Sequence, residues 1–379
     1  MVETETRRDI VLVTGASGFI GTMVSEALAA RYHVVGLDLR PPPDGGSDHI
    51  AFIDIDLTSD KSVHTALQRV RAEHGARLAS VIHLAAYFDL TGEPDPKYEQ
   101  VTVRGTERLM RELKSFDVEQ FVFSSTMLVH APAPRGTRIN EDSPLEARFP
   151  YRISKLETER RLRAEHGAIP LVIIRPAGVY DHLGRSTFLA HQIARIYERR
   201  LLSHFYSGKL NTGQPSLHLD DLVDTVLRIV ERRKALPVEA KFLLGEPDTP
   251  TYAELQHTLG CLIHGEEWTT RQIARPIAKS GAWLQQAVLE EDSFIKPWMV
   301  ESANDHYELD LSRARQLLGW EPRHSLRAEL PGIIDALKKD SVGWYRANKL
   351  NTAAIAAREP AVAGHSSQAD GSASISQAH

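Results

Sequence analysis

The sequence predicts an α/β protein: a doubly wound parallel sheet of the Rossmann type with a smaller, mostly helical C-terminal substrate-binding region. Two observations indicate this. Short apolar runs alternate with amphipathic helical stretches in the first half, and a glycine-rich turn joins the first run to the first helix. We expect a nucleotide-binding domain over residues 8–180, a partly interleaved substrate-binding region over 181–350, and a disordered tail over 351–379.

Six short apolar runs have the composition of buried strands: Ile10–Val13, Val34–Leu37, Ala51–Ile53, Ser80–Leu84, Gln120–Phe123 and Leu171–Ile174. Helices are expected between them, near Ile20–Arg31, Lys61–Glu73, Tyr98–Lys114 and Tyr151–His166. Later helices are expected near Thr187–Arg199, Leu222–Arg232, Tyr252–Leu262 and Arg313–Leu318. The tail is rich in Ala, Ser, Gln and Gly and lacks aromatic residues, so it buries too little apolar surface to offset its ordering entropy.

Charge and cysteine content limit the class of function. Lys and Arg number 45 against 50 Asp and Glu, a formal net charge of −5, and no basic stripe offers a nucleic-acid surface. The single cysteine, Cys261, allows no disulfide within the chain, which fits a reducing compartment. No run has the length of a membrane span or of a signal peptide's apolar segment. We therefore expect a cytoplasmic protein with a small-molecule substrate and neither nucleic acid nor membrane as partner.

A candidate phosphate cradle lies in the segment Thr14-Gly15-Ala16-Ser17-Gly18-Phe19-Ile20-Gly21, between the first strand and the first helix. Gly15 permits the tight turn, Gly18 lets the backbone approach a diphosphate, and Gly21 lets the helix pack closely on the strand. The amides of the helix N-terminus and its dipole favour an anion, so Ser17, Phe19 and Ile20 are also expected to contact the cofactor. The alternative is a glycine-rich turn that binds nothing, which the surrounding strand and helix disfavour.

Asp38 ends the second predicted strand, where a carboxylate in such folds accepts hydrogen bonds from the adenosine ribose hydroxyls. Because this carboxylate would repel a 2′-phosphate, NAD is the expected cofactor rather than NADP. Arg40, two residues later, would soften that exclusion. The alternative role of Asp38 is to cap the turn before Pro41–Pro43.

Tyr151 and Lys155 lie four residues apart, on one face of a predicted helix. A phenol with a pKa near ~10 is a poor base at neutral pH. A neighbouring ammonium lowers that pKa and fits the phenol for proton transfer, and Lys155 is also placed to bind the nicotinamide ribose. The segment Ser124-Ser125-Thr126, at the end of the fifth strand, supplies a hydroxyl for the substrate oxygen.

The same spacing recurs at Tyr345 and Lys349, without a preceding strand or hydroxyl cluster. We interpret this second pair as a feature of a surface helix.

Together these residues resemble the extended short-chain dehydrogenase/reductase family, often described as NAD-dependent epimerases/dehydratases, over roughly residues 10–335. The matching segments are the glycine loop, Asp56-Leu57, His83-Leu84-Ala85-Ala86, Ser124-Ser125-Thr126, Tyr151 with Lys155, Arg175-Pro176, His218–Leu222 and Leu318–Pro322. The resemblance implies Asp56 and Leu57 beside adenine, and Leu84, Ala85 and Ala86 along the cofactor. It implies Tyr151 as general acid/base, Lys155 as its partner, and Thr126, or alternatively Ser125, as the polarising hydroxyl. It also implies a possible homodimer through the helices near 98–114 and 151–166.

Departures from relatives narrow the expected chemistry. Met127-Leu128 stands where sugar-nucleotide dehydratases carry Asp-Glu, and Cys261 lies far from any epimerising Cys-Lys motif. Gly178 and Gln214 replace an Asn and an Arg with which nucleotide-sugar 4-epimerases bind their substrate. The sequence therefore predicts hydride transfer at a secondary alcohol or ketone. The alternatives are a redox-neutral sugar epimerase and, less favoured, an NAD-binding regulator without catalysis.

For several side chains the sequence allows two roles, one in substrate binding and one in the structure. His130 either bonds the substrate or satisfies a turn, and His218 more naturally holds a loop against the sheet. Phe88, Phe188 and His191 line the pocket or pack in the core. None of the 17 histidines has a spacing typical of a metal site, so no metal is expected.

Overall fold

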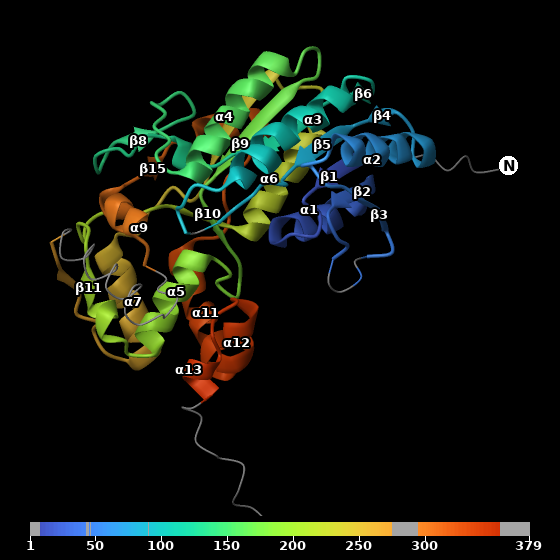
Figure 1. Ribbon diagram of the computed structural model, residues 1–379. Helices are drawn as coiled ribbons and strands as arrows, with labels where there is room; N and C mark the ends of the chain where they lie inside the picture. Colours follow the sequence, from blue (N-terminus) through green and yellow to red (C-terminus); the bar gives the residue numbers. More distant parts are fainter. Residues whose placement is uncertain (1–7, 43–44, 46, 90, 275–294, 357–379) are drawn as a thin grey trace, which may run out of the picture.

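The computed structural model describes residues 8–42, 45, 47–89, 91–274 and 295–356. Among these residues, seven parallel strands form one sheet in the order β13-β9-β7-β5-β1-β2-β3. The strands are β1 (Ile10–Thr14), β2 (His33–Asp38), β3 (Ile50–Asp54), β5 (Ser80–His83), β7 (Phe121–Ser124), β9 (Leu171–Pro176) and β13 (Glu239–Leu244). All six predicted strands are present, and the predicted doubly wound fold is confirmed (Figure 1).

Helices cover both faces of the sheet, as alternating strands and helices require. One face carries α1 (Phe19–Ala29), α6 (Leu219–Glu231) and α10 (Ser312–Leu318), and the other carries α2 (Asp60–Glu73), α3 (Arg104–Leu113) and α4 (Pro150–Glu165). Each face has its own apolar core, centred on Val24 and Val226 on one side and on Leu67 and Leu109 on the other. The predicted helix near Tyr98–Lys114 begins as a π-helical segment, η1 (Tyr98–Val103), that leads into α3.

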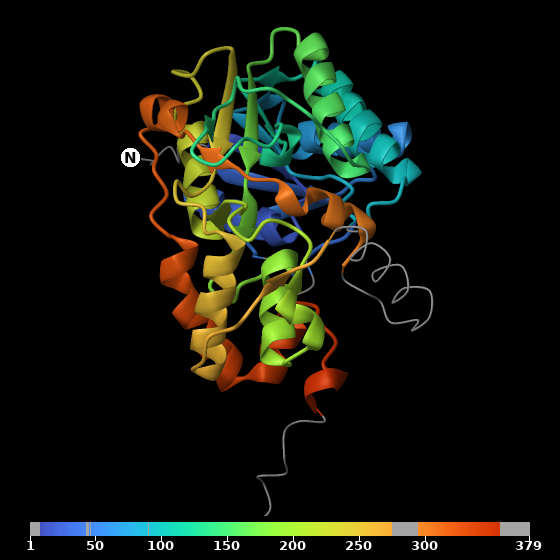
Figure 2. The same cartoon turned by 90° about the vertical axis from the view of Figure 1, so that its left-hand side faces the viewer.

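A third apolar core lies in the C-terminal region (Figure 2). It is built from α5 (Thr187–Tyr197), α7 (Tyr252–His264), α11 (Leu326–Lys339) and α12 (Ser341–Ala347). Local signals explain some boundaries: Thr251 and Glu254 form a capping box at the start of α7, and Gly265 ends it at a φ of 72°. A shorter helix, α9 (Pro297–Glu301), and the 3₁₀ turn η4 (Ser302–Asn304) cross back toward the sheet.

Short parallel pairs complete the connections. They are β4 (Arg77–Leu78) with β6 (Asp117–Val118), β8 (Arg138–Ile139) with β15 (Glu308–Leu309), β10 (Gly178–Tyr180) with β12 (Ser216–His218), and β11 (Phe205–Tyr206) with β14 (Arg271–Gln272). The 3₁₀ turns η2 (Met127–Val129) and η3 (Leu201–His204) follow β7 and α5. No described helix has both the length and the apolar character required to cross a membrane.

Two expectations need correction. Tyr345 does not lie on the surface: it is 1% exposed on α12, and its hydroxyl donates to Oε1 of Glu198 at 2.8 Å. The segment predicted as a tail from residue 351 starts with a short helix, α13 (Ala353–Ala356), because Ile355 reaches the third core and is 2% exposed. The remainder of that segment, 357–379, lies outside the described residues.

Candidate active site

The glycine loop lies directly after β1, at the carboxyl edge of the sheet. A Cβ at Gly21 would approach the carbonyl oxygen of Gly15 to 2.0 Å, and one at Gly15, whose φ is +73°, would approach the amide nitrogen of Ala85 to 2.8 Å. Both positions therefore require glycine. No side chain caps the start of α1 at Gly18, so the amides of its first turn, Phe19 and Ile20, remain available to an anion.

Asp38 connects the end of β2 to this loop. Its Oδ2 accepts a hydrogen bond from the backbone N–H of Ser17 at 3.0 Å, and its Oδ1 accepts one from Leu39 at 2.7 Å. The Ser17 hydroxyl donates to the carbonyl oxygen of Arg40 at 2.6 Å. The carboxylate is thus fixed beside the cradle at the strand end, where the sequence placed it.

The other predicted cofactor residues lie on neighbouring strand ends. After β5, the backbone N–H of Leu84 donates to Thr14 at 3.1 Å, and Ala85 and Ala86 continue the loop, both partly buried. After β3, Asp56 accepts hydrogen bonds from the backbone N–H and hydroxyl of Thr58, at 2.8 and 2.7 Å. Leu57, 5% exposed, lies against the position where Gly105 would carry a Cβ.

Tyr151 and Lys155 lie on the first two turns of α4, and the structure brings them to the end of β7. The Lys155 ammonium donates to the carbonyl oxygen of Ser124 at 2.6 Å and lies 4.9 Å from the ring centroid of Phe123. The same ammonium lies 5.9 Å from the ring centroid of Tyr151. The pair is therefore assembled on one helix face, as the four-residue spacing predicted.

The acid–base properties of this pair differ from the expectation. Desolvation, together with the phenol of Tyr98, raises the pKa of Tyr151 to about 12. The lowering predicted from Lys155 does not outweigh burial of the phenol here, because the ammonium is bound to the carbonyl oxygen of Ser124. Burial likewise lowers the pKa of Lys155 to about 7, and the nearby carboxylate of Glu159 opposes that shift.

The two candidate hydroxyls have different surroundings. Thr126, 7% exposed, interacts with the Tyr151 phenol and favours a lower pKa for it. Ser125 is 2% exposed, and its hydroxyl instead helps to lower the pKa of Glu159. The geometry therefore favours Thr126 over Ser125 as the hydroxyl that meets the substrate oxygen.

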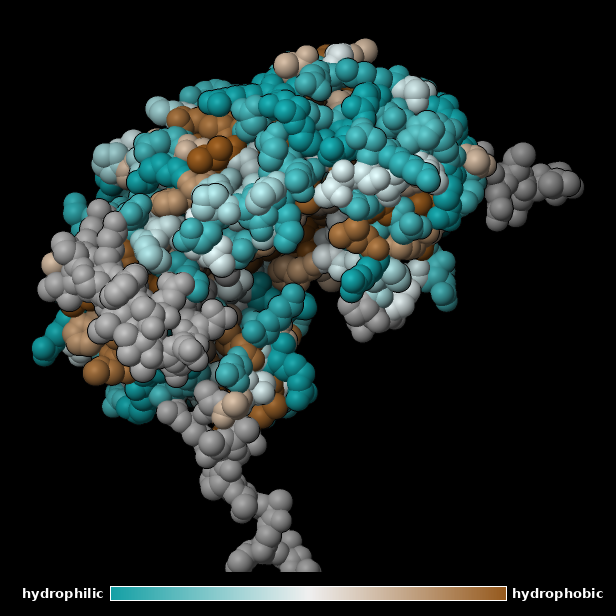
Figure 3. Space-filling model, in the orientation of Figure 1, coloured by the Kyte–Doolittle hydropathy of each residue, from teal (hydrophilic) through white to brown (hydrophobic). Residues whose placement is uncertain are grey.

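Four aromatic rings lie in the segments that lead to the site, and we call Phe88, Phe149, Phe188 and Trp298 the aromatic wall. Of these, Phe88 contacts Tyr151, and the other three contact one another. Phe88 makes an edge contact with Tyr151 at 4.9 Å between ring centroids, and it is 54% exposed. Phe149, two residues before Tyr151, lies 5.4 Å from Trp298, which lies 6.1 Å from Phe188. In the space-filling view, apolar side chains are exposed where the sheet meets the C-terminal region (Figure 3).

Arg185 is a candidate cofactor residue that sequence reasoning missed. Its guanidinium carbon lies 4.7 Å from the ring centroid of Phe19, at the start of α1. The buried carboxylate of Asp181 holds it, accepting from the Arg185 side chain at 2.7 Å and from its backbone N–H at 2.9 Å. No spacing pattern in the sequence signals this contact, because 166 residues separate the two positions.

His130 and His218, for which the sequence left two interpretations, both contact other protein groups. His130 is fully buried, and its Nε2 lies 3.0 Å from Nη1 of Arg175, so it contacts protein rather than substrate. His218 caps α6 by accepting from the Asp220 N–H at 3.2 Å, and its ring stacks on His324. Ligand-type atoms of His218, Asp220 and His324 lie within 4.8 Å of one another, but the capping bond occupies Nδ1 of His218 and the helix dipole disfavours a cation there.

Comparison with known proteins agrees with this geometry. The model of the NAD dependent epimerase/dehydratase family matches residues 11–245. The chain is 23% identical to UDP-glucose 4-epimerase of Vibrio cholerae, over 84% of this chain and 92% of that one. It is 29% identical to 3 beta-hydroxysteroid dehydrogenase type 7 of Mus musculus, over 83% and 92%. The crystal structure of UDP-glucuronic acid 4-epimerase from Bacillus cereus with UDP-glucuronic acid and NAD gives a TM-score of 0.65 at 21% identity, covering 87% and 99%.

A glycine cradle, a carboxylate at the end of the second strand and a Tyr/Lys pair on a parallel sheet are the features of a nucleotide-dependent enzyme. The chain belongs to the NAD dependent epimerase/dehydratase family, the extended branch of the short-chain dehydrogenase/reductases. Its cofactor is NAD, and the loop fits this cofactor because a Cβ at Gly15 or Gly21 would collide with backbone.

Proposed function

We propose that this enzyme is an NAD-dependent dehydrogenase that interconverts a secondary alcohol and a ketone on an apolar substrate. The aromatic wall beside Tyr151 carries the proposal. Two of its rings, Phe88 and Phe188, are 54% and 44% exposed, and exposed large apolar side chains beside a reactive group are typical of a substrate surface.

The charges beside the wall also favour an apolar substrate. Arg148 and Arg152, the cations that flank Tyr151 in the sequence, both pair with Asp305, at 2.8 and 3.5 Å. Arg152 and Asp305 are buried, so their charges are already compensated within the protein. A nucleotide-sugar diphosphate would instead need cations that no carboxylate already pairs with.

Each residue of the site has a role in this reaction. Bound NAD supplies the hydride acceptor for the alcohol carbon. Thr126 donates its hydroxyl to the substrate oxygen, and Tyr151 takes the alcohol proton, or returns it to the ketone in reduction. Lys155 places a positive charge behind the phenol, which favours the phenolate when the proton arrives or leaves. The aromatic wall excludes water and orients the substrate ring system.

The cofactor contacts follow from the same geometry. Gly15, Ser17, Gly18 and the amides of Phe19 and Ile20 hold the diphosphate, with Asp38 on the adenosine ribose. Arg185 would add a positive charge from the opposite side of the cradle, because Asp181 and the Phe19 ring hold its side chain there. The diphosphate would thus be bound from both the sheet and the C-terminal region.

A redox-neutral sugar epimerase is the second candidate, favoured by the 23% identity with a UDP-glucose 4-epimerase across most of both chains. Such an enzyme uses the same acid–base residues, but returns the hydride to its substrate and keeps NADH bound. Against this candidate, Gly178 on β10 has no side chain to donate, and the exposed Gln214 carries no positive charge where an Arg is expected for a nucleotide sugar.

A substrate panel distinguishes the two candidates. The enzyme is incubated with NAD and with cyclic and polycyclic secondary alcohols, free sugars and UDP-sugars, and both NADH and products are quantified. We expect NADH to accumulate in equal amount to ketone with the apolar alcohols. The Trp298→Ala variant should raise KM for these alcohols by about tenfold while leaving the Kd of NAD unchanged. Epimer interconversion of a UDP-sugar without NADH release would overturn the dehydrogenase proposal.

A further inference from the structure

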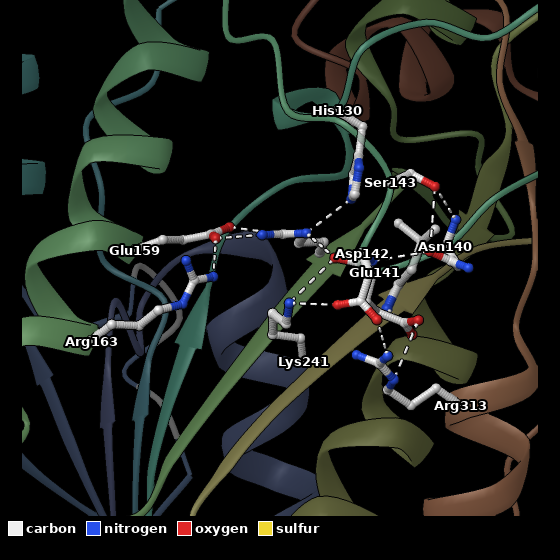
Figure 4. A network of polar contacts seen from close by, with 11 residues as sticks. His130, Asn140, Glu141, Asp142, Ser143, Glu159, Arg163, Lys241 and Arg313 are labelled. Carbon is white, nitrogen blue, oxygen red and sulfur yellow. Dashed lines mark hydrogen bonds and ion pairs between the residues drawn. The ribbon is translucent and has the colours of Figure 1, made fainter.

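A completely buried ion pair lies behind the active site. Glu159, on α4, and Arg175, on β9, both have 0% exposure. The guanidinium donates to the carboxylate through two parallel hydrogen bonds, Nε to Oε1 at 2.9 Å and Nη2 to Oε2 at 2.6 Å. Figure 4 shows Glu159 in a wider network that also includes His130, Asn140, Glu141, Asp142, Ser143, Arg163, Lys241 and Arg313.

Glu159 belongs to the same helix face as the catalytic pair. Tyr151, Lys155 and Glu159 follow one another at intervals of four residues on α4, so each lies one turn beyond the last. Lys155 is 2% exposed. The carboxylate is therefore the next charged group behind a buried ammonium, in surroundings where water does not screen their interaction.

Arg175 keeps this carboxylate ionised and in place. Burial alone would raise the pKa of Glu159, but the Arg175 guanidinium outweighs this effect and lowers that pKa. Arg163 donates a third hydrogen bond to the Glu159 carboxylate at 2.9 Å. The remaining donors of Arg175 bind Nε2 of His130 and the carbonyl oxygen of Glu141, both at 3.0 Å. A buried pair of this kind adds little net stability over apolar side chains, so a purely structural role explains it poorly.

The other titratable groups near Lys155 do not supply a negative charge. His83, on β5, is fully buried, and burial lowers its pKa to about 3, so it is neutral. Tyr151 and the neighbouring Tyr98 of η1 are neutral phenols, because burial raises the pKa of both. Glu159 is thus the carboxylate that acts on the ammonium within the described structure.

We propose that Glu159, held ionised by Arg175, is a positioning residue that keeps the buried Lys155 cationic during turnover. The residue acts through Lys155 and touches neither substrate nor cofactor. The inference rests on the proposed function, because a positive charge behind Tyr151 matters only if Tyr151 transfers a proton. It gives a functional reason for the buried ion pair between Glu159 and Arg175.

The direct test is the titration of Lys155, followed by NMR in the whole cofactor-free protein labelled with ¹³C-lysine. A Lys155→Met variant assigns its signal. We expect the Glu159→Gln variant to lower the pKa of Lys155 by about one unit or more, because an opposite charge has been removed from a buried site. Glu157→Gln, the same change on a partly exposed residue of the same helix, should leave that titration unchanged.

A second variant guards against misfolding, because Glu159→Gln leaves Arg175 buried without its partner. The double variant Glu159→Gln/Arg175→Met removes both charges and should fold with a higher Tm than Glu159→Gln alone. The pKa of Lys155 should nevertheless remain low in the double variant. In turnover assays, the alkaline limb of the kcat/KM profile should move toward acid by the same amount as the NMR titration.

The outcomes separate this inference from the proposed function. If Lys155 titrates as in the wild type in both Glu159 variants, or if the double variant restores the wild-type pH profile, Glu159 is only structural and the inference is wrong. If no substrate in the panel is turned over, the proposed function fails, while the NMR titration still decides the charge on Lys155.

Discussion

At the scale of single residues, the proposed chemistry depends on two groups of α4, Tyr151 and Lys155, whose pKa values are shifted in opposite directions. Burial raises the pKa of Tyr151 to about 12 and lowers that of Lys155 to about 7. Both shifts favour the neutral forms: at neutral pH the Tyr151 phenol is protonated, and Lys155 is divided between its charged and neutral forms.

Asp38 is expected to select NAD over NADP. Replacing it in Asp38→Asn removes the charge that repels a 2′-phosphate while keeping a side chain that bonds the Ser17 N–H. We expect NADP to bind about tenfold more tightly to this variant than to the wild type, which is about 1.4 kcal/mol. Titration of both cofactors by fluorescence measures the change.

The control for this prediction is Asp54→Asn. Asp54 pairs with Asp38 across β2 and β3, but its side chain points to solvent, so cofactor preference should stay unchanged. A wild-type enzyme that binds NADP more tightly than NAD would contradict the role given to Asp38.

At the scale of elements, α1 and the glycine loop form the cofactor cradle only if they pack at backbone contact. The Gly21→Ala variant would place a methyl group 2.0 Å from the carbonyl oxygen of Gly15. We expect the free energy of unfolding to fall by about 1–3 kcal/mol, because the helix must move away from the loop. The Kd of NAD should rise at least about tenfold with it, by calorimetry.

Gly332 offers a matched control on another helix. It lies within α11, and a Cβ there would meet nothing within 4 Å. Gly332→Ala should therefore raise the free energy of unfolding by about 0.5–1 kcal/mol, through helix propensity, with no effect on NAD affinity. Equal behaviour of the two variants would show that close packing at Gly21 is not what forms the cradle.

The same elements show what the sequence could predict. Buried strands such as Val34–Leu37 are continuous apolar runs, and the glycine loop, Asp38 and the Tyr151/Lys155 pair have fixed spacings, so periodicity and motif locate them. β13 was not assigned, because Glu239 and Lys241 interrupt its apolar pattern at the sheet edge. α11 escaped prediction because Pro331 lies inside it, a residue that normally ends a helix.

The substrate surface was beyond prediction for a different reason. Phe88, Phe149, Phe188 and Trp298 come from four separate segments. Only tertiary packing brings Phe88 to Tyr151 and the other three rings to one another. The Tyr345/Lys349 pair shows the converse, because its spacing matches the catalytic pair while Tyr345 lies in an apolar core.

At the scale of the whole molecule, we expect stability to fall between pH 7 and pH 5. Burial lowers the pKa of His83 to about 3 and that of His130 to about 4, so both stay neutral in the folded state. In the unfolded chain they take up protons below a pKa of ~6.5. At pH 5 this proton uptake lowers the free energy of unfolding by about 2 kcal/mol for each histidine. The stability associated with these neutral histidines is therefore complete above the pKa of the unfolded chain and is lost as the pH falls below it.

One buried acid works in the opposite direction. Burial raises the pKa of Glu246 to about 7, so acidification removes a buried charge that destabilises the fold. Between pH 7 and pH 5 this raises the free energy of unfolding by about 2 kcal/mol. His191, whose pKa burial also lowers to about 4, adds a further loss of about 2 kcal/mol. The net expectation is a loss of about 4 kcal/mol, measured by urea unfolding at the two pH values. A higher urea midpoint at pH 5 would show that neutral buried histidines do not govern the pH dependence.

The most direct measurement is turnover and NAD affinity in the Tyr151→Phe variant, compared with Tyr345→Phe. We expect Tyr151→Phe to lower kcat by about 10²–10⁴-fold while the Kd of NAD stays within about twofold, because only the proton-transfer hydroxyl is lost. Tyr345→Phe removes a hydroxyl bound to the buried Glu198 and should lower Tm without abolishing turnover. Comparable activity in Tyr151→Phe and the wild type would contradict the assignment of acid–base chemistry to Tyr151.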